Sequence, residues 1–215
     1  MPERDEDAAM IGEAAPGGVG LLIVDMINDI AFEGGEALRV KAEAVASTIL
    51  VLRDEADGLK IPVVYVNDNF GQWHSERSKI VEACSSSDSP ARGMVARIAP
   101  RDRDYFVIKP QFSGFYATNL PVLLPKLGVS RLVITGIAAD ICVLFTAADA
   151  HMREYELWVP KDTVASEVEA RTEWALDIMR KSMNAETCST EQLSLKAWIS
   201  ARRFPSGAQA TLSAG

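Results

Sequence analysis

Short apolar runs alternate along the chain with segments in which apolar and polar residues have helical spacing. The run at residues 20–25 (GLLIVD) is continuously apolar and ends in an acid, as is typical of a strand buried on both faces. Such runs predict five strands, at residues 20–25, 61–67, 105–108, 131–135 and 156–159, and we expect residues 185–188 to form a short sixth strand. The segments between and after them predict helices, at residues 36–58, 117–127, 140–151, 167–183 and 191–202.

Strands separated by helices require crossover connections, so this order predicts a three-layer α/β/α fold with a mainly parallel six-stranded sheet. Residues 71–100 are less regular, and we expect them to form a long excursion over the carboxyl edge of the sheet, where such folds bind ligands. Residues 1–17 predict a flexible arm and residues 203–215 a flexible tail. A single domain at residues 18–202 remains between them.

Composition and charge exclude several classes of protein. The chain has 22 Lys and Arg against 30 Asp and Glu, a net charge of −8, which disfavours nucleic acid and anionic membranes as partners. It contains no run of 18 apolar residues and begins without the features of a secretory signal. Cys84, Cys142 and Cys188 fit neither a disulfide framework nor a metal knuckle, so we expect a cytoplasmic protein with reduced thiols.

Three reactive side chains follow three different predicted strands. Asp25 ends the first strand, Lys109 the third, and the fourth leads through Gly136 to Cys142. Because parallel strands end at one edge of the sheet, these groups should converge there. A neighbouring ammonium stabilises a carboxylate and favours a thiolate. Each residue alone has an ordinary structural explanation, but together they predict a catalytic site.

The loop at residues 135–142 suits a nucleophilic cysteine. Gly136 permits an unusual backbone angle after the strand, and small Ala138 and Ala139 allow backbone N–H groups to face a ligand. Cys142 falls in the first turn of the next helix, where a thiol pKa is lowered and N–H donors are available to an oxyanion.

Three segments carry a resemblance to a known family: LLIVDMINDIAFEGG (21–35), KPQFSGFYATNL (109–120) and TGIAADICVLFTAADA (135–150). Together they resemble the isochorismatase-like cysteine hydrolases, a superfamily that includes nicotinamidases and N-carbamoyl and ureido amidohydrolases. The likeness extends from about Gly20 to Ile199. It implies the sheet order 3-2-1-4-5-6 and a homo-oligomer, to which helices such as 117–127 or 140–151 would supply contacts.

The resemblance also implies roles for individual residues. Cys142 would be the nucleophile, Asp25 the general acid and base, and Lys109 the cation that joins them. The Ile137–Ala138 bond lies where the family has a non-prolyl cis peptide, and the N–H groups of Ala138 and Cys142 would form the oxyanion hole. Asp25 would take the thiol proton, the thiolate would attack an amide carbonyl, and water would then cleave the thioester.

Many nicotinamidases also hold a divalent metal, through an Asp-x-His pair and a further histidine after the second strand. Asp68 matches the aspartate, but Phe70 stands in the place of the histidine, and His74 is offset. His151 follows Cys142 by roughly 13 Å of helix, too far to serve as a base. We therefore expect neither a metal nor another cofactor.

The substrate pocket is less well defined by the sequence. Asn67, Asp68 and Asn69 either hydrogen-bond a polar substrate or close a turn, and the loop aromatic residues either line the pocket or pack in the core. Asn28 is expected to support the loop of Asp25, and Cys84 and Cys188 to be structural. The pocket candidates are Asn28, Phe32, Asn67, Asp68, Trp73 and Phe115.

Together these features predict a cysteine-dependent amidohydrolase that cleaves a small carboxamide, ureido or carbamoyl substrate. The alternatives are a nicotinamidase with metal-assisted substrate binding and a non-catalytic binding or scaffold member of the same fold. Cleavage of isochorismate is disfavoured because the enzymes of this superfamily that perform it lack the nucleophilic cysteine. A dinucleotide fingerprint is excluded because the glycines at residues 17–20 precede the first strand instead of following it.

Overall fold

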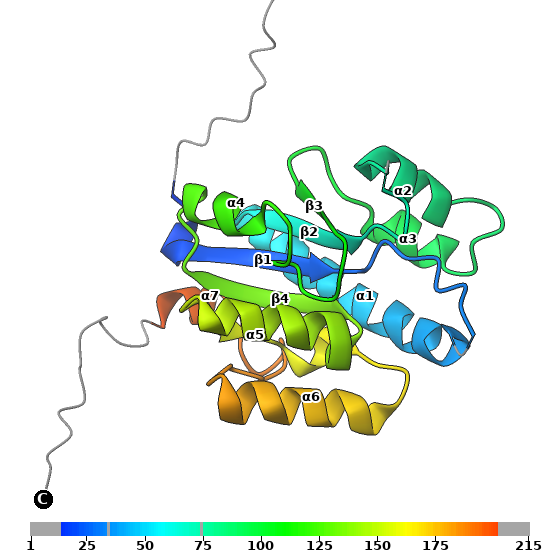
Figure 1. Ribbon diagram of the computed structural model, residues 1–215. Coiled ribbons are helices and arrows are strands. Elements are labelled where there is room, and N and C mark those ends of the chain that lie inside the picture. Colours follow the sequence, from blue (N-terminus) through cyan, green and yellow to red (C-terminus); the bar gives the residue numbers. More distant parts are fainter. Residues whose placement is uncertain (1–13, 34, 74, 202–215) are drawn as a thin grey trace, which may run out of the picture.

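A computed structural model describes residues 14–33, 35–73 and 75–201 of the chain. Its centre is an all-parallel sheet in the order β3-β2-β1-β4-β5, with the short β6 paired to the end of β4 (Figure 1). This confirms the predicted fold class. The strands are β1 (Val19–Val24), β2 (Val63–Asp68), β3 (Tyr105–Lys109), β4 (Arg131–Ile137), β5 (Glu156–Trp158) and β6 (Val164–Ala165).

Helices cover both faces of the sheet, because alternate strand residues point to opposite sides. Leu21 and Ile23 of β1 belong to one apolar core, and Leu22 and Val24 to the other. The first core is covered by α1 (Gly35–Gly58), α2 (Arg77–Cys84), α3 (Arg92–Ile98) and α7 (Leu195–Ser200). The second is covered by α4 (Leu120–Lys126), α5 (Leu144–Met152) and α6 (Glu169–Ser182).

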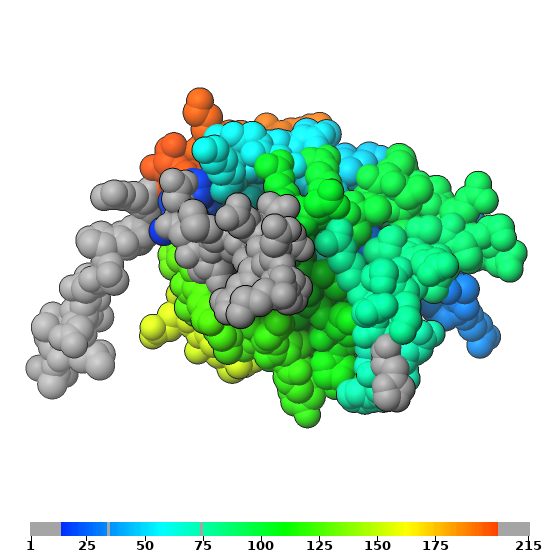
Figure 2. All heavy atoms as spheres, turned by 90° about the horizontal axis from the view of Figure 1, so that it is seen from above, coloured from blue at the N-terminus to red at the C-terminus, as the bar shows by residue number. Residues whose placement is uncertain are grey.

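The segment between β2 and β3 is more regular than its sequence suggested. It contains α2 and α3, which bury Ile80, Cys84 and Met94 in the same core as α1. In Figure 1 both helices lie beyond the carboxyl end of β1, and Figure 2 shows them gathered at one end of the molecule. The expected excursion past this edge of the sheet is therefore built on two short helices.

The prediction of a strand at residues 185–188 is wrong. Glu186 makes only an isolated parallel bridge to Trp158. A Glu186 carboxylate oxygen accepts hydrogen bonds from the backbone N–H groups of Thr187 and Cys188, at 2.9 and 3.0 Å, so these two donors point at their own segment. The sixth strand is β6 instead, which pairs with Gly136 and Ile137.

Part of the predicted N-terminal arm is packed on the domain. Ala15 is buried, and its N–H donates to the carbonyl of Leu127 at 2.9 Å. Residues 1–13 and the predicted tail at 203–215 lie outside the described residues. Within the part of the chain that the structure describes, no helix is long and apolar enough to cross a membrane.

A buried ion pair joins α1 to the loop before β3. Arg53 of α1 and Asp104 form this pair with side chains that are each 1% exposed. Arg53 also donates to the carbonyl of Ala99 at 3.0 Å, and its guanidinium lies 5.4 Å from the centre of the Tyr65 ring. Each partner would be a buried, uncompensated charge without the other.

Arg53→Leu is therefore expected to lower the free energy of unfolding by about 3–5 kcal/mol, because it leaves the Asp104 carboxylate buried without its cation. The exposed pair of Arg180 and Asp177 is the matched control, and Arg180→Ala should cost less than about 1 kcal/mol. Urea denaturation followed by circular dichroism measures both values. Equal losses in the two variants would contradict the assigned role of the buried pair.

Candidate active site

Asp25 is held at the point where β1 ends. Its N–H donates to the carbonyl of Val66 at 2.9 Å, and its backbone has a positive φ of 51°, a conformation that aspartate tolerates better than most residues. The neighbouring strand β4 approaches β1 closely here, because a Cβ at Gly136 would lie 2.0 Å from the carbonyl oxygen of Val24. Glycine is thus required at position 136 for this approach.

Lys109 brings the three predicted groups together. Its Nζ lies 2.9 Å from Oδ2 of Asp25, 3.4 Å from Sγ of Cys142 and 3.3 Å from Oδ2 of Asp68. The last contact follows from the sheet register, in which Asp68 of β2 pairs with Lys109 of β3. An ammonium has three N–H donors, so these three acceptors match the full donor capacity of this buried side chain.

Burial dominates the acid–base behaviour of this cluster. It raises the pKa of Asp25 above its ordinary value, against the opposing effects of Lys109 and of hydrogen bonds from Cys142 and the backbone of Asp68. Burial, followed by the charge of Asp25, raises the pKa of the Cys142 thiol to about 12, although Lys109 acts in the opposite direction. The pKa of Lys109 is raised as well, since the neighbouring acidic groups outweigh the effect of burial.

The thiol therefore keeps its proton at neutral pH, whereas the position of Cys142 at a helix start and beside an ammonium predicted a lowered thiol pKa. The physical reason is that Asp25, the partner of the same ammonium, is itself a buried negative charge next to the sulfur. A carboxylate with a raised pKa accepts a proton more readily. The arrangement therefore suits transfer of the thiol proton to Asp25 once a substrate is present.

Cys142 lies in a single π-helical turn, Ala139–Val143, that precedes α5. The N–H groups of Ile141 and Val143 both donate to the carbonyl of Ala138 at 3.1 Å. The Ile137–Ala138 peptide bond, which leads into this turn, is cis. Use of the Ala138 and Cys142 N–H groups as an oxyanion hole stays a prediction.

Two side chains of α5 that the sequence did not single out hold the loop after Lys109. Thr146 Oγ1 accepts from the N–H of Gly114 at 2.9 Å, and Asp149 accepts from the hydroxyl of Ser113. Both residues follow Cys142 on one helix face, at the fourth and seventh positions, and this spacing was the available signal. They tie the loop that follows Lys109 to the helix that follows Cys142.

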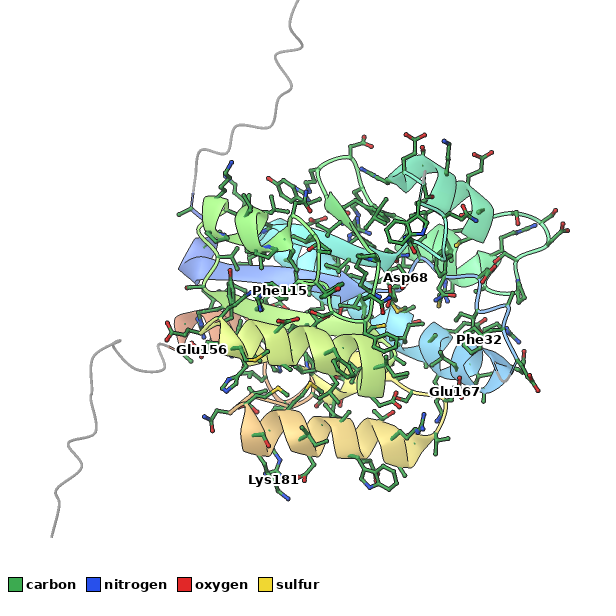
Figure 3. The ribbon with its side chains drawn as sticks, in the orientation of Figure 1. Phe32, Asp68, Phe115, Glu156, Glu167 and Lys181 are labelled. Atoms are coloured by element: carbon green, nitrogen blue, oxygen red, sulfur yellow. The ribbon has the colours of Figure 1, made fainter. Side chains whose placement is uncertain are left out.

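Two of the predicted pocket residues are structural. Asn67 is fully buried, with Oδ1 accepting from the N–H of Ile27 at 3.1 Å and Nδ2 donating to its carbonyl at 2.9 Å, so it braces the loop after β1. Phe115 is 3% exposed and packs against Tyr155 and Arg153, at the end of α5 remote from Cys142. Figure 3 shows Phe115 away from Asp68. These interactions replace the expected contacts with substrate.

The remaining candidates lie in loops at the carboxyl edge of the sheet. Asn28 Oδ1 accepts from the N–H of Ile30 at 2.8 Å, which supports the loop, as expected. Phe32 and Trp73 are 47% and 77% exposed, and Figure 3 places Phe32 and Asp68 at the same end of the molecule. Their contact with substrate stays a prediction. His74 lies outside the described residues.

The residues near Asp68 do not fit a catalytic metal. Oδ2 of Asp68 faces the ammonium of Lys109, and Oδ1 accepts from the N–H of Phe70 at 2.7 Å. Across residues 14–33, 35–73 and 75–201, no three His, Cys, Asp or Glu side chains are grouped to hold an ion. To bind a metal ion through Oδ2, Asp68 would first have to give up its ion pair with Lys109.

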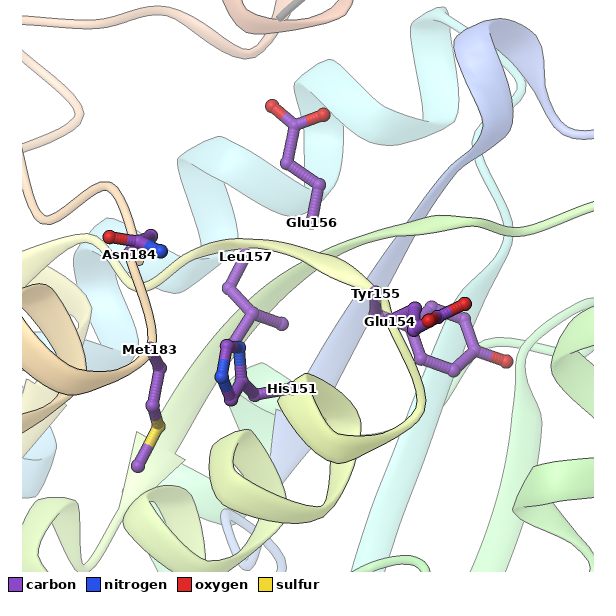
Figure 4. Close-up of a pocket in the computed structure, with 7 residues that line it drawn as sticks. All are labelled: His151, Glu154, Tyr155, Glu156, Leu157, Met183 and Asn184. Atoms are coloured by element: carbon purple, nitrogen blue, oxygen red, sulfur yellow. The ribbon is translucent and has the colours of Figure 1, made fainter. Parts of the chain in front are cut away.

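His151 is remote from the reactive groups. It lies in the last turn of α5 and lines a pocket of about 600 Å³ with Glu154, Tyr155 and Met183 (Figure 4). Cys142 precedes the first turn of the same helix. The imidazole therefore takes no part in the cluster around Lys109.

Comparisons with known proteins agree with this fold. The family model described as the isochorismatase domain matches residues 19–192. An uncharacterized isochorismatase family protein of Bacillus subtilis, YaaI, is 44% identical over 173 residues, which cover 80% of this chain and 94% of that protein.

Two further relatives are named for an enzymatic activity. The ureidoacrylate amidohydrolase RutB of Serratia proteamaculans is 28% identical over 72% of this chain and 71% of its own. The crystal structure of N-carbamoylsarcosine amidase from Thermoplasma acidophilum has a TM-score of 0.59 and 28% identity, covering 82% of this chain and 98% of that one. Because the family model spans most of the chain, this protein belongs to the isochorismatase family.

Proposed function

We propose that this isochorismatase-family hydrolase is a cysteine-dependent amidohydrolase that acts on a small carboxamide, ureido or carbamoyl compound. The observation that carries the proposal is the contact of one buried ammonium with both a carboxylate and a thiol, at 2.9 and 3.4 Å. A nucleophile, a base beside it and a cation that orients both are the elements of covalent acyl transfer.

The proposed reaction begins with transfer of the Cys142 proton to Asp25. The thiolate attacks the substrate carbonyl, and the carbonyl electron pair moves to oxygen to give a tetrahedral oxyanion. When the oxyanion collapses, the C–N bond breaks and the protonated Asp25 gives its proton to the departing nitrogen. A thioester on Cys142 remains. Asp25 then removes a proton from water, which cleaves the thioester and restores the thiol.

Lys109 holds its charge throughout this sequence. Its raised pKa keeps it protonated at neutral pH, so it stabilises the thiolate during attack and the Asp25 carboxylate between proton transfers. Asp68 accepts the remaining donor of the ammonium and thereby limits its rotation.

The relatives support the substrate class. Two of them are named for ureidoacrylate and N-carbamoylsarcosine, and both of these compounds contain a carbamoyl group bonded to nitrogen. The metal-assisted nicotinamidase alternative is weakened by the pairing of Asp68 with Lys109, and the scaffold alternative by the complete set of reactive groups. Self-association and a cytoplasmic location stay predictions.

Cys142→Ala should abolish ammonia release from every active member of a panel of small amides and ureido compounds, because no nucleophile remains. The lost sulfur should change the free energy of unfolding by only about 1 kcal/mol. Intact-mass spectrometry of rapidly quenched wild-type protein should show an acyl adduct that the variant lacks. Cys84→Ser and Cys188→Ala are the controls and should retain turnover. Normal turnover by Cys142→Ala would refute the nucleophile.

Asp25→Asn should have opposite effects on turnover and on thiol reactivity. Turnover should fall by about 10²–10⁴-fold, because an amide cannot accept the thiol proton. Alkylation of Cys142 by iodoacetamide at pH 7, followed by peptide mass mapping, should become faster, because loss of the negative charge lowers the raised pKa of the thiol. In wild type the alkylation rate should climb steadily above pH 7.

Asp29→Asn is the control for that experiment. Asp29 lies on the same loop, and its Oδ1 accepts from the N–H of Ala31 at 3.1 Å, a bond that an amide oxygen can also accept. Both rates should stay at wild-type values in this variant. Slower alkylation in Asp25→Asn would show that the carboxylate does not raise the thiol pKa.

Prolonged dialysis against a chelator should leave kcat unchanged, because the proposed reaction uses the carboxylate, ammonium and thiol of the chain. Elemental analysis by mass spectrometry should accompany the assay, so that removal of zinc, manganese and iron is verified. Loss of turnover that is restored by one of these ions would favour the metal-assisted nicotinamidase alternative.

A further inference from the structure

A reciprocal side-chain contact joins the turn of Cys142 to the segment that follows β6. The hydroxyl of Ser166 donates to Oδ1 of Asp140 at 2.6 Å, and the N–H of Asp140 donates to the same hydroxyl oxygen at 3.2 Å. Ser166 is only 1% exposed, and Asp140 is partly buried. The Ser166 hydroxyl thus both donates a hydrogen bond to Asp140 and accepts one from it.

Asp140 is the second residue of the π-helical turn Ala139–Val143. It lies two residues after Ala138 and two before Cys142, between the predicted oxyanion donors. Fixing its backbone N–H and its side chain together fixes the path of the π-helical turn Ala139–Val143. Neither Ser166 nor Asp140 contacts the ammonium of Lys109 in the described contacts, so any effect on the reaction passes through the backbone.

Ser166 is itself anchored from three elements. It directly follows β6, whose Ala165 pairs with Ile137 of β4. Its N–H donates to Oγ1 of Thr172 in α6 at 2.9 Å, and its carbonyl accepts from Nζ of Lys41 in α1 at 3.3 Å. In Figure 3 the adjacent Glu167 lies at the same end of the molecule as Phe32 and Asp68. The serine is therefore a rigid point against which the turn can be held.

We propose that Ser166 is a positioning residue that acts through Asp140 to hold the N–H donors of the Cys142 turn in place for the developing oxyanion. This inference rests on the proposed function, because it presupposes that Cys142 attacks a carbonyl. The exposed ion pair of Asp140 with Arg171, at 3.3 Å, is secondary, because the Arg171 side chain is 54% exposed. The buried hydroxyl is the specific element of the contact.

Ser166→Ala tests the proposal, with Ser89→Ala as its matched control. Ser89 is also a buried serine, but its hydroxyl has no hydrogen-bond partner among the described residues. Ser166→Ala should lower kcat by about 100-fold with little change in KM, because displaced donors weaken transition-state binding more than substrate binding. Ser89→Ala should keep the wild-type kcat and KM.

Two readouts separate positioning from general damage. Alkylation of Cys142 by iodoacetamide needs no oxyanion hole, so its rate and pH dependence in Ser166→Ala should equal those of wild type. Hydrogen–deuterium exchange in the peptide that covers residues 137–143 should accelerate in Ser166→Ala and not in Ser89→Ala. Unchanged exchange, or a lowered alkylation rate in parallel with kcat, would overturn the proposal.

A second variant covers the case in which Ser166→Ala does not fold. Asp140→Ala removes the same contact from its more exposed side, and it should reproduce the fall in kcat with unchanged alkylation. Where both variants fold, their double variant should lose no more activity than either alone, because the two groups act as one unit. Multiplication of the two losses would refute the coupling.

Failure of this inference is distinguishable from failure of the proposed function. The exchange measurement reports on the turn without any substrate, whereas the proposed function fails when Cys142→Ala retains turnover. Full kcat in Ser166→Ala together with inactive Cys142→Ala would leave the nucleophile in place and remove only the positioning role.

Discussion

The site depends on one buried cation. The ammonium of Lys109 lies in the interior, where a charge without partners is strongly unfavourable. Its partners come from the ends of β1 and β2 and from the turn after β4, so no single element of the chain can satisfy it. The contacts that compensate the buried charge of Lys109 are therefore the same contacts that bring the reactive side chains together.

The surrounding structure restricts the positions of these partners. Gly136 allows β4 to approach β1 at the point where Asp25 begins its turn. Thr146 and Asp149 tie the loop after Lys109 to the helix that follows Cys142. Ser166 ties the turn of Cys142 to β6 and α6. The first two contacts join segments that carry different reactive groups, and the third holds the turn of Cys142 against the sheet, so the geometry does not depend on one loop alone.

The pairing of the Lys109 ammonium with two carboxylates also influences the protonation of Asp25 and Cys142. Because Asp25 and Asp68 share the ammonium, the sulfur lies beside a cation that is already paired. Burial and the charge of Asp25 then keep the proton on the thiol, and the same burial makes Asp25 a better acceptor for it. A histidine is unnecessary for this exchange, and His151 is at the other end of its helix.

Much of the fold could be predicted from the sequence, because the patterns that carry it are local. The apolar runs identified five strands, and their order with the helices implied parallel pairing. Asp25, Lys109 and Cys142 could be selected because each follows a strand end. The short helices between β2 and β3 were missed, since they have only eight and seven residues and the serine-rich segment 85–89 separates them. The strand at residues 185–188 was overpredicted because the sequence does not reveal that Glu186 turns its carboxylate onto its own segment.

Only the tertiary structure decided the remaining features. Asn67 and Phe115 have the residue types of a substrate pocket, but Asn67 braces a backbone segment 40 residues away and Phe115 packs against Tyr155. The raised pKa of the Cys142 thiol also depends on the tertiary structure, because burial and the charge of Asp25 outweigh the local effect of a helix start. The chain sequence by itself determined which groups are available for chemistry. Their long-range contacts determined which of them meet, and in what charge state.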